Sequence, residues 1–165
     1  MRGGWTAERN DGYRRPVSYR RILVGTDGSA PSLKSVREAA RLAKSFGAEL
    51  LVVCAYGALD QGTVNRWREE APEEISWRFT PSTIADEAIA KGEAAAAEEG
   101  VTARMLTEKG EAAEALILVA EHEDADLIVV GNRGMTGPTR FLLGSVPNKV
   151  SHNAPCDVLI IKTFP

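Results

Sequence analysis

The feature that most constrains the fold is a regular alternation between short, continuous apolar runs and longer segments with helical periodicity. The first run is Ile22-Leu23-Val24-Gly25, and a helical stripe occupies residues 32–46. The other strand-like segments are 50–55, 101–106, 127–131 and 158–161, and the other helical patterns are 82–98, 112–121 and 146–152. The chain therefore alternates five expected strands with four expected helices.

Continuous apolar runs of this length are typical of strands that are covered on both faces. Strands that alternate with helices predict a parallel sheet joined by right-handed crossovers. The pattern thus indicates a single α/β domain with helices on both faces of a five-stranded parallel sheet. Residues 101–106 alternate only weakly, which suits a strand nearer the edge of the sheet.

Composition excludes several classes of protein. The 165 residues carry a net charge of −3, so we expect no general nucleic-acid-coating function. No apolar run approaches the ~20 residues that cross a bilayer, and no apolar core follows the first arginines as in a secretory signal. Two cysteines without CxxC spacing and two isolated histidines favour neither a disulfide scaffold nor a metal site. We therefore expect a cytoplasmic protein without a membrane or nucleic-acid partner.

The N-terminal stretch differs from the rest of the chain. Residues 1–21 hold six arginines and only two acidic residues, together with three glycines and one proline. Such a composition buries too little apolar surface to fold alone. We predict a flexible basic arm at 1–19 and one folded domain at 20–165.

Candidate binding residues follow the strands, where open α/β sheets bind their ligands. Thr26 and Asp27 follow the first apolar run, and a glycine-rich stretch from Gly131 follows the fourth. Further on, Gly144 and Ser145 open a short helix, whose free amides would attract an anion. A carboxylate for ribose hydroxyls and a glycine-rich cradle for phosphates together indicate a nucleotide site.

Two common phosphate motifs, GxxxxGK[ST] and GxGxxG, are absent from the sequence. Ser145 lacks the G-x-S-x-G context of a nucleophile, and neither histidine falls in the loops just described. We predict no catalytic residue and no metal ligand, hence binding without efficient turnover and at most slow ATP hydrolysis.

The spacing Gly131-x2-Gly134-x9-Gly144-Ser145 resembles the G-2x-G-9x-G-[S/T] signature of the universal stress protein family, in its nucleotide-binding branch. The resemblance extends over residues 20–162 and includes the stretches 24–29, 142–146 and 154–160. It implies a Rossmann-like sheet of order 3-2-1-4-5. It also implies a homodimer, which we expect to form through the last strand, and a site for ATP, with or without Mg²⁺, or for a related adenine nucleotide such as AMP.

The resemblance also assigns roles to individual residues. Asp27 would bind the ribose with Thr26 beside it, and the backbone of Ala55 would contact adenine. The positions that match the phosphate-binding turn are Gly131, Gly134, Gly144, Ser145 and Val146, with Arg133 adding positive charge in the same loop.

Two positions depart from the usual pattern. Asn132 stands where serine is frequent, and Pro147 stands where serine or threonine is frequent. Proline in the first turn of a helix removes one amide donor. Together with Cys54-Ala55-Tyr56, these positions resemble a subgroup of the family that binds cyclic AMP, which needs fewer phosphate donors.

These observations predict an adenine-nucleotide-binding regulator or adaptor in a stress response. A cyclic-AMP-binding member of the family is one alternative. A weak ATP hydrolase of the adenine-nucleotide hydrolase group is another, although residues 27–32 are a poor version of its pyrophosphate loop. A pure interaction module with an empty site is the third.

Overall fold

The computed structural model describes residues 18–57, 81–132 and 143–163, without the side chains of residues 81–83. Its strands are β1 (Arg21–Gly25), β2 (Glu49–Gly57), β3 (Ala103–Gly110), β4 (Leu127–Gly131) and β5 (Asp157–Ile161). Its helices are α1 (Ala30–Phe46), α3 (Pro81–Glu98), α4 (Ala112–His122) and α5 (Ser145–Asn153).

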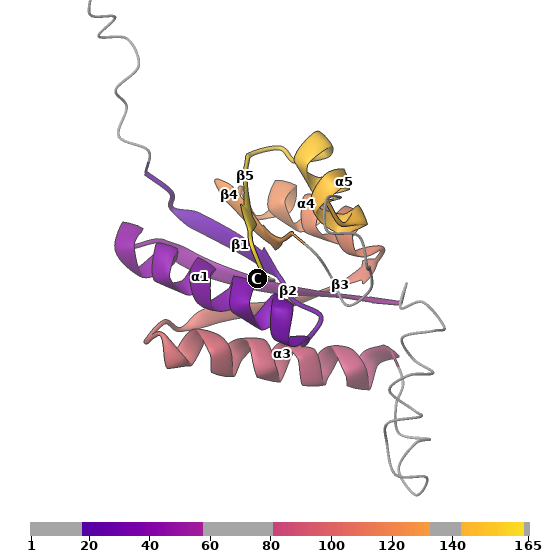
Figure 1. Ribbon diagram of the computed structural model, residues 1–165, viewed down its shortest axis with the longest axis horizontal. Coiled ribbons are helices and arrows are strands. Elements are labelled where there is room, and N and C mark those ends of the chain that lie inside the picture. The colour runs from indigo at the N-terminus through magenta and orange to yellow at the C-terminus, as the bar shows by residue number, and fades with distance from the viewer. Residues whose placement is uncertain (1–17, 58–80, 133–142, 164–165) are drawn as a thin grey trace, which may run out of the picture.

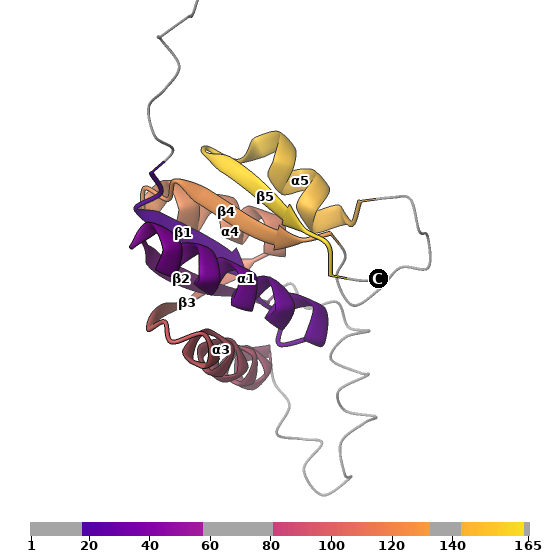
Figure 2. The ribbon, with the colours of Figure 1, turned by 60° about the vertical axis from the view of Figure 1, so that its left-hand side comes forward.

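The strands form one parallel sheet of order β3-β2-β1-β4-β5. Helices α1 and α3 cover one face, and α4 and α5 cover the other (Figure 1). Figure 2 shows α1 in front of the sheet and α4 and α5 behind it. The structure confirms the expected fold class, strand order and two-faced helical cover.

The continuous apolar runs are explained by burial on both faces. In β1, Ile22 and Val24 pack in the core under α1 and α3, whereas Leu23 packs in the core under α4 and α5. Each of these three side chains is fully buried. Because successive side chains of a strand point to opposite faces, the interior positions of a strand covered on both faces are all apolar.

The weakest sequence pattern gave the least accurate boundaries. The third strand was expected at residues 101–106 and lies at Ala103–Gly110. Its register is set by β2, with which it pairs from Leu50 opposite Ala103 to Gly57 opposite Gly110. Pairing with a long neighbour therefore extends this edge strand beyond its apolar residues.

Candidate functional site

The site lies at the carboxyl ends of β1 and β4, where the strand order reverses. Thr26, directly after β1, is 7% exposed, and its N–H donates to the carbonyl of Val53 in β2 at 2.9 Å. Its Oγ1 lies 3.1 Å from Ser32 Oγ and accepts from the Gly28 N–H at 3.1 Å. These contacts fold the β1–α1 turn back on itself.

Asp27 is held within the same turn. Its Oδ1 accepts from the N–H of Ser29 at 3.0 Å and from Ser29 Oγ at 2.5 Å. Ser29 is in turn the N-cap of α1, with its side chain accepting from the N–H of Ser32. Within the described residues, no partner approaches the second carboxylate oxygen, Oδ2, which is the atom available to a ligand.

The first turn of α5 faces Asp27 across a cavity. Gly144 is the N-cap of this helix, without a side-chain cap, and its N–H donates to the carbonyl of Asn132 at 3.0 Å. The N–H groups of Ser145 and Val146 have no partner in the described part of the chain. Free amides at the start of a helix favour an anion there.

A cavity of about 110 Å³ joins these elements. Its walls come from the ends of β1, β2 and β4 and from the starts of α4 and α5. The lining residues are Gly25, Thr26, Asp27, Ser32, Val53, Ala55, Ala112, Leu116, Val130, Gly131, Val146 and Pro147. Apolar side chains with a few polar groups are typical of a small-molecule site.

The structure brings together most of the residues that the sequence singled out. Five of them line the cavity: Thr26, Asp27, Ala55, Gly131 and Val146. Gly144 and Ser145 come directly before Val146 at the start of α5, while Arg133 and Gly134 lie outside the described residues. The binding role of each residue stays a prediction.

Sequence reasoning missed part of the wall. Ala112 and Leu116 are on α4, which follows β3, and Pro147 was noted only for its missing amide. The close approach of α4 to β1 is visible at Gly25, where a Cβ would lie 2.9 Å from Leu116 Cδ1. No motif predicts that contact. In a parallel sheet, however, the helix after each strand begins near the carboxyl ends of the strands, where ligands bind.

Cys54 of β2 directly precedes Ala55, which lines the cavity, and is 4% exposed. Burial, followed by the nearby carboxylates of Asp27 and Asp86, raises the pKa of this thiol to about 11. The thiol is therefore protonated and unreactive at neutral pH. It packs with Ala85 and Ala88 of α3 as a small apolar side chain.

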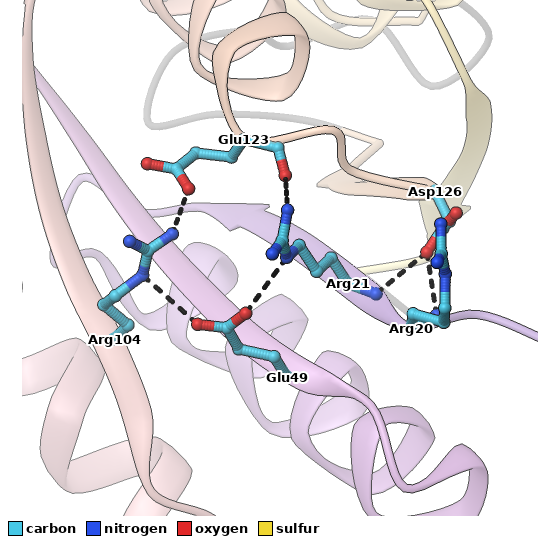
Figure 3. Close-up of polar contacts among 6 residues, drawn as sticks. All are labelled: Arg20, Arg21, Glu49, Arg104, Glu123 and Asp126. Carbon is cyan, nitrogen blue, oxygen red and sulfur yellow. Dashed lines mark hydrogen bonds and ion pairs between the residues drawn. The ribbon is translucent and has the colours of Figure 1, made fainter.

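A larger hollow of about 870 Å³ lies at the opposite, amino-terminal ends of the strands, lined by Arg20, Arg21, Glu49 and Asp126 among others. Figure 3 shows the ion pair between Arg21 and Glu49 there, together with the hydrogen bonds that the backbone N–H groups of Arg20 and Arg21 donate to Asp126. Glu49 contacts both Arg21 and Arg104, and Arg104 also contacts Glu123. This network connects neighbouring strands, so we assign it to the stability of the sheet edge.

The chain matches one known protein family over most of its length. The model of the universal stress protein family matches residues 18–162. The chain belongs to the universal stress protein family.

Two relatives extend over most of this family member. A universal stress protein from Methanocaldococcus jannaschii is 35% identical over 147 residues, covering 87% of this chain and 82% of the relative. One from Mycobacterium tuberculosis is 36% identical over 149 residues, covering 88% of this chain and 98% of the relative.

Solved structures of the family have the same fold. A universal stress protein crystallised with cAMP superposes with a TM-score of 0.66 at 29% identity, covering 89% of this chain and 99% of that one. UspA from Lactobacillus plantarum superposes with a TM-score of 0.67 at 23% identity, covering 88% of this chain and 99% of that one. At 23% identity, the similarity to the Lactobacillus plantarum structure shows the fold alone.

The described residues contain no helix long and apolar enough to cross a membrane. In the same residues, no group of three or more His, Cys, Asp or Glu side chains could hold a metal ion.

Proposed function

We propose that this universal stress protein binds an adenine nucleotide, with ATP the leading candidate, and acts as a regulator or adaptor in a cytoplasmic stress response. The observation that carries the proposal is that Asp27 and Val146 line one cavity, and that within the described residues the amides of Val146 and the preceding Ser145 have no partner. A carboxylate suits the hydroxyls of a ribose, and amides at a helix start suit phosphate.

In this proposal, the nucleobase packs against the apolar part of the cavity. Ala55, Val53 and Leu116 offer a surface of aliphatic carbon beside the strand ends. A flat aromatic base gains free energy by leaving water for such a surface. Arg133 and Gly134 would complete the phosphate turn, and Mg²⁺ would arrive with the phosphates of ATP.

Cyclic AMP is the second candidate, because Pro147 is the third residue of α5 and has no N–H. The N–H of Asn148 already donates to the carbonyl of Gly144 at 3.0 Å. The helix therefore presents two amides, from Ser145 and Val146, which suits one phosphate group better than three. The related structure that contains cAMP is consistent with this candidate.

The proposal includes a homodimer formed through β5. This strand is an edge of the sheet, and Ile160 within it is 36% exposed. An edge strand presents unpaired backbone groups that can pair with a second copy. Sedimentation should then give a dimer at micromolar concentration, and a monomer there would contradict this part of the proposal.

The first experiment is to denature the purified protein and identify any released nucleotide by chromatography and mass spectrometry. Nucleotide-free protein is then titrated with ATP, AMP and cyclic AMP. Tight ATP binding supports the first candidate, and tighter cyclic AMP binding supports the second. Failure of all three ligands at millimolar concentration would contradict the proposal and leave an interaction module with an empty site.

Turnover is tested with the same preparation. Incubation with ATP in the presence of Mg²⁺ should release product only slowly, since the described cavity contains one acid, Asp27, and no histidine. Multiple-turnover release of AMP and pyrophosphate would instead favour the hydrolase alternative.

A further inference from the structure

Asn132, which directly follows β4, joins three separate segments of the chain. Its carbonyl accepts from the N–H of Gly144 at 3.0 Å, and its own N–H donates to the carbonyl of Ile161 at 2.8 Å. Its side-chain Oδ1 accepts from both the N–H and the hydroxyl of Thr163, each at 2.8 Å. One residue thus connects the start of α5 with the chain that leaves β5.

Thr163 is unusually well buried for a polar residue at the end of the described chain. It is 9% exposed, and its backbone N–H and its hydroxyl both donate to the same oxygen atom, Asn132 Oδ1. A buried hydroxyl without a hydrogen-bond partner would destabilise the fold. The contact between Asn132 and Thr163 therefore favours one relative position of the two residues.

The connection continues into the candidate phosphate site. The N–H of Gly144 donates to the carbonyl of Asn132, and the carbonyl of Gly144 accepts from the N–H of Asn148 in the first turn of α5. The amides of Ser145 and Val146 lie between these two contacts in the chain. Any movement of Asn132 should therefore move the free amides relative to Gly131.

We propose that Asn132 and Thr163 are positioning residues for the amides of Ser145 and Val146 at the start of α5, so that Thr163, two residues after β5, supports nucleotide affinity. This inference rests on the proposed function. Neither side chain needs to touch the ligand. Linkage then requires that a bound nucleotide stabilise the contact between Asn132 and Thr163 by the same factor by which the contact strengthens binding.

The test compares Thr163→Val, which keeps the shape but loses the hydroxyl donor, with Thr163→Ser, which keeps the donor. Binding is measured for the nucleotide that the wild type binds and for adenosine, which has the base and ribose but no phosphate. We expect Thr163→Val to weaken nucleotide binding about three- to tenfold, corresponding to one lost hydrogen bond. Adenosine binding should stay within about twofold, and Thr163→Ser should restore nucleotide affinity.

A merely structural role gives a different result. If the contact only stabilises the fold, Thr163→Val will lower the melting temperature while the affinities for nucleotide and adenosine remain unchanged or fall together. Either outcome would overturn the inference.

Hydrogen exchange in the wild type provides a test that does not depend on a variant's stability. The Thr163 N–H donates to Asn132 Oδ1, so nucleotide should slow its exchange and adenosine should not. Equal exchange with and without nucleotide would overturn the inference even though the nucleotide binds. If the wild type binds no nucleotide at all, that result contradicts the proposed function, and it is thereby distinguished from a failure of the positioning role alone.

Discussion

The carboxylate of Asp27 and the residue two positions later, Ser29, are joined by two hydrogen bonds to the same oxygen, Oδ1. One carboxylate oxygen therefore shapes the turn before α1, while no hydrogen-bond partner of Oδ2 lies among the described residues. This division allows the structural and the binding roles of Asp27 to be separated by mutation.

Asp27→Asn keeps an oxygen that can accept from Ser29, and Asp27→Ala removes it. We expect Asp27→Ala to lower the free energy of unfolding by about 1 kcal/mol and Asp27→Asn to lower it less. Both variants should weaken nucleotide binding by about tenfold or more, because each removes the charged acceptor. Urea unfolding and calorimetric titration measure the two effects.

The matched control is Asp124→Asn, which removes the same charge from an exposed residue at the opposite end of the sheet. Its affinity should equal that of the wild type. Wild-type affinity in Asp27→Asn would instead show that the carboxylate does not contact the ligand.

Gly28 and Gly47 both have positive φ angles, of 75° and 64°, but only Gly28 is crowded. A Cβ at Gly28 would lie 3.0 Å from the Cα of Ala88 in α3, whereas a Cβ at Gly47 would meet no atom within 4 Å. Gly47→Ala should therefore cost about 1 kcal/mol from backbone strain, and Gly28→Ala about 2 to 3 kcal/mol. Equal losses in urea unfolding would contradict the close packing of α3 on this turn.

Asp126 uses one carboxylate oxygen to accept from the N–H groups of Arg20 and Arg21, at 2.8 and 2.9 Å (Figure 3). Burial acts to raise the pKa of this carboxyl, but these backbone bonds and the two arginine charges outweigh it and hold the pKa below its usual value. A depressed pKa in the folded state stabilises the fold above the unfolded-state pKa of about 4, and this stability is lost as pH falls through the folded-state value.

Asp126→Asn should accordingly be less stable than the wild type at pH 7, by about 1 kcal/mol, and the difference should shrink below pH 4. Urea unfolding at pH 7 and pH 3 measures it. A difference that stays constant between the two pH values would contradict a charge-dependent role.

Cys54 gives a second pH-dependent prediction, of opposite direction. Burial, Asp27 and Asp86 raise the pKa of its thiol from 9.0 to about 11. The stabilising contribution is fully present below pH 9 and is lost as pH rises through 11, because the unfolded state releases its proton first. Relative to Cys54→Ala, the wild type should lose about 1 to 2 kcal/mol between pH 7.5 and pH 10.5 in urea unfolding. Parallel losses in both proteins would contradict the assignment to this thiol.

Much of the candidate site could be anticipated because motif residues occupy defined places in a parallel sheet. Thr26 and Asp27 follow β1 and Gly131 ends β4, and because the apolar runs of both strands are unambiguous, the edge at which these residues meet follows from topology. Leu116 and Pro147 could not be assigned to the cavity wall in this way. Their place depends on how closely α4 and α5 approach the strands, and the small Gly25 permits the approach of Leu116 on α4.

The sequence by itself determined the fold class, since strands that are apolar at every position must be buried on both faces by the helices between them. It also determined which strand ends carry polar and glycine-rich turns. Only the tertiary structure decided that Asn132 reaches Thr163, a residue 31 positions away. Such a contact depends on the register between β4 and β5 and on the path of the chain after β5. Neither of these produces a periodic pattern in the sequence.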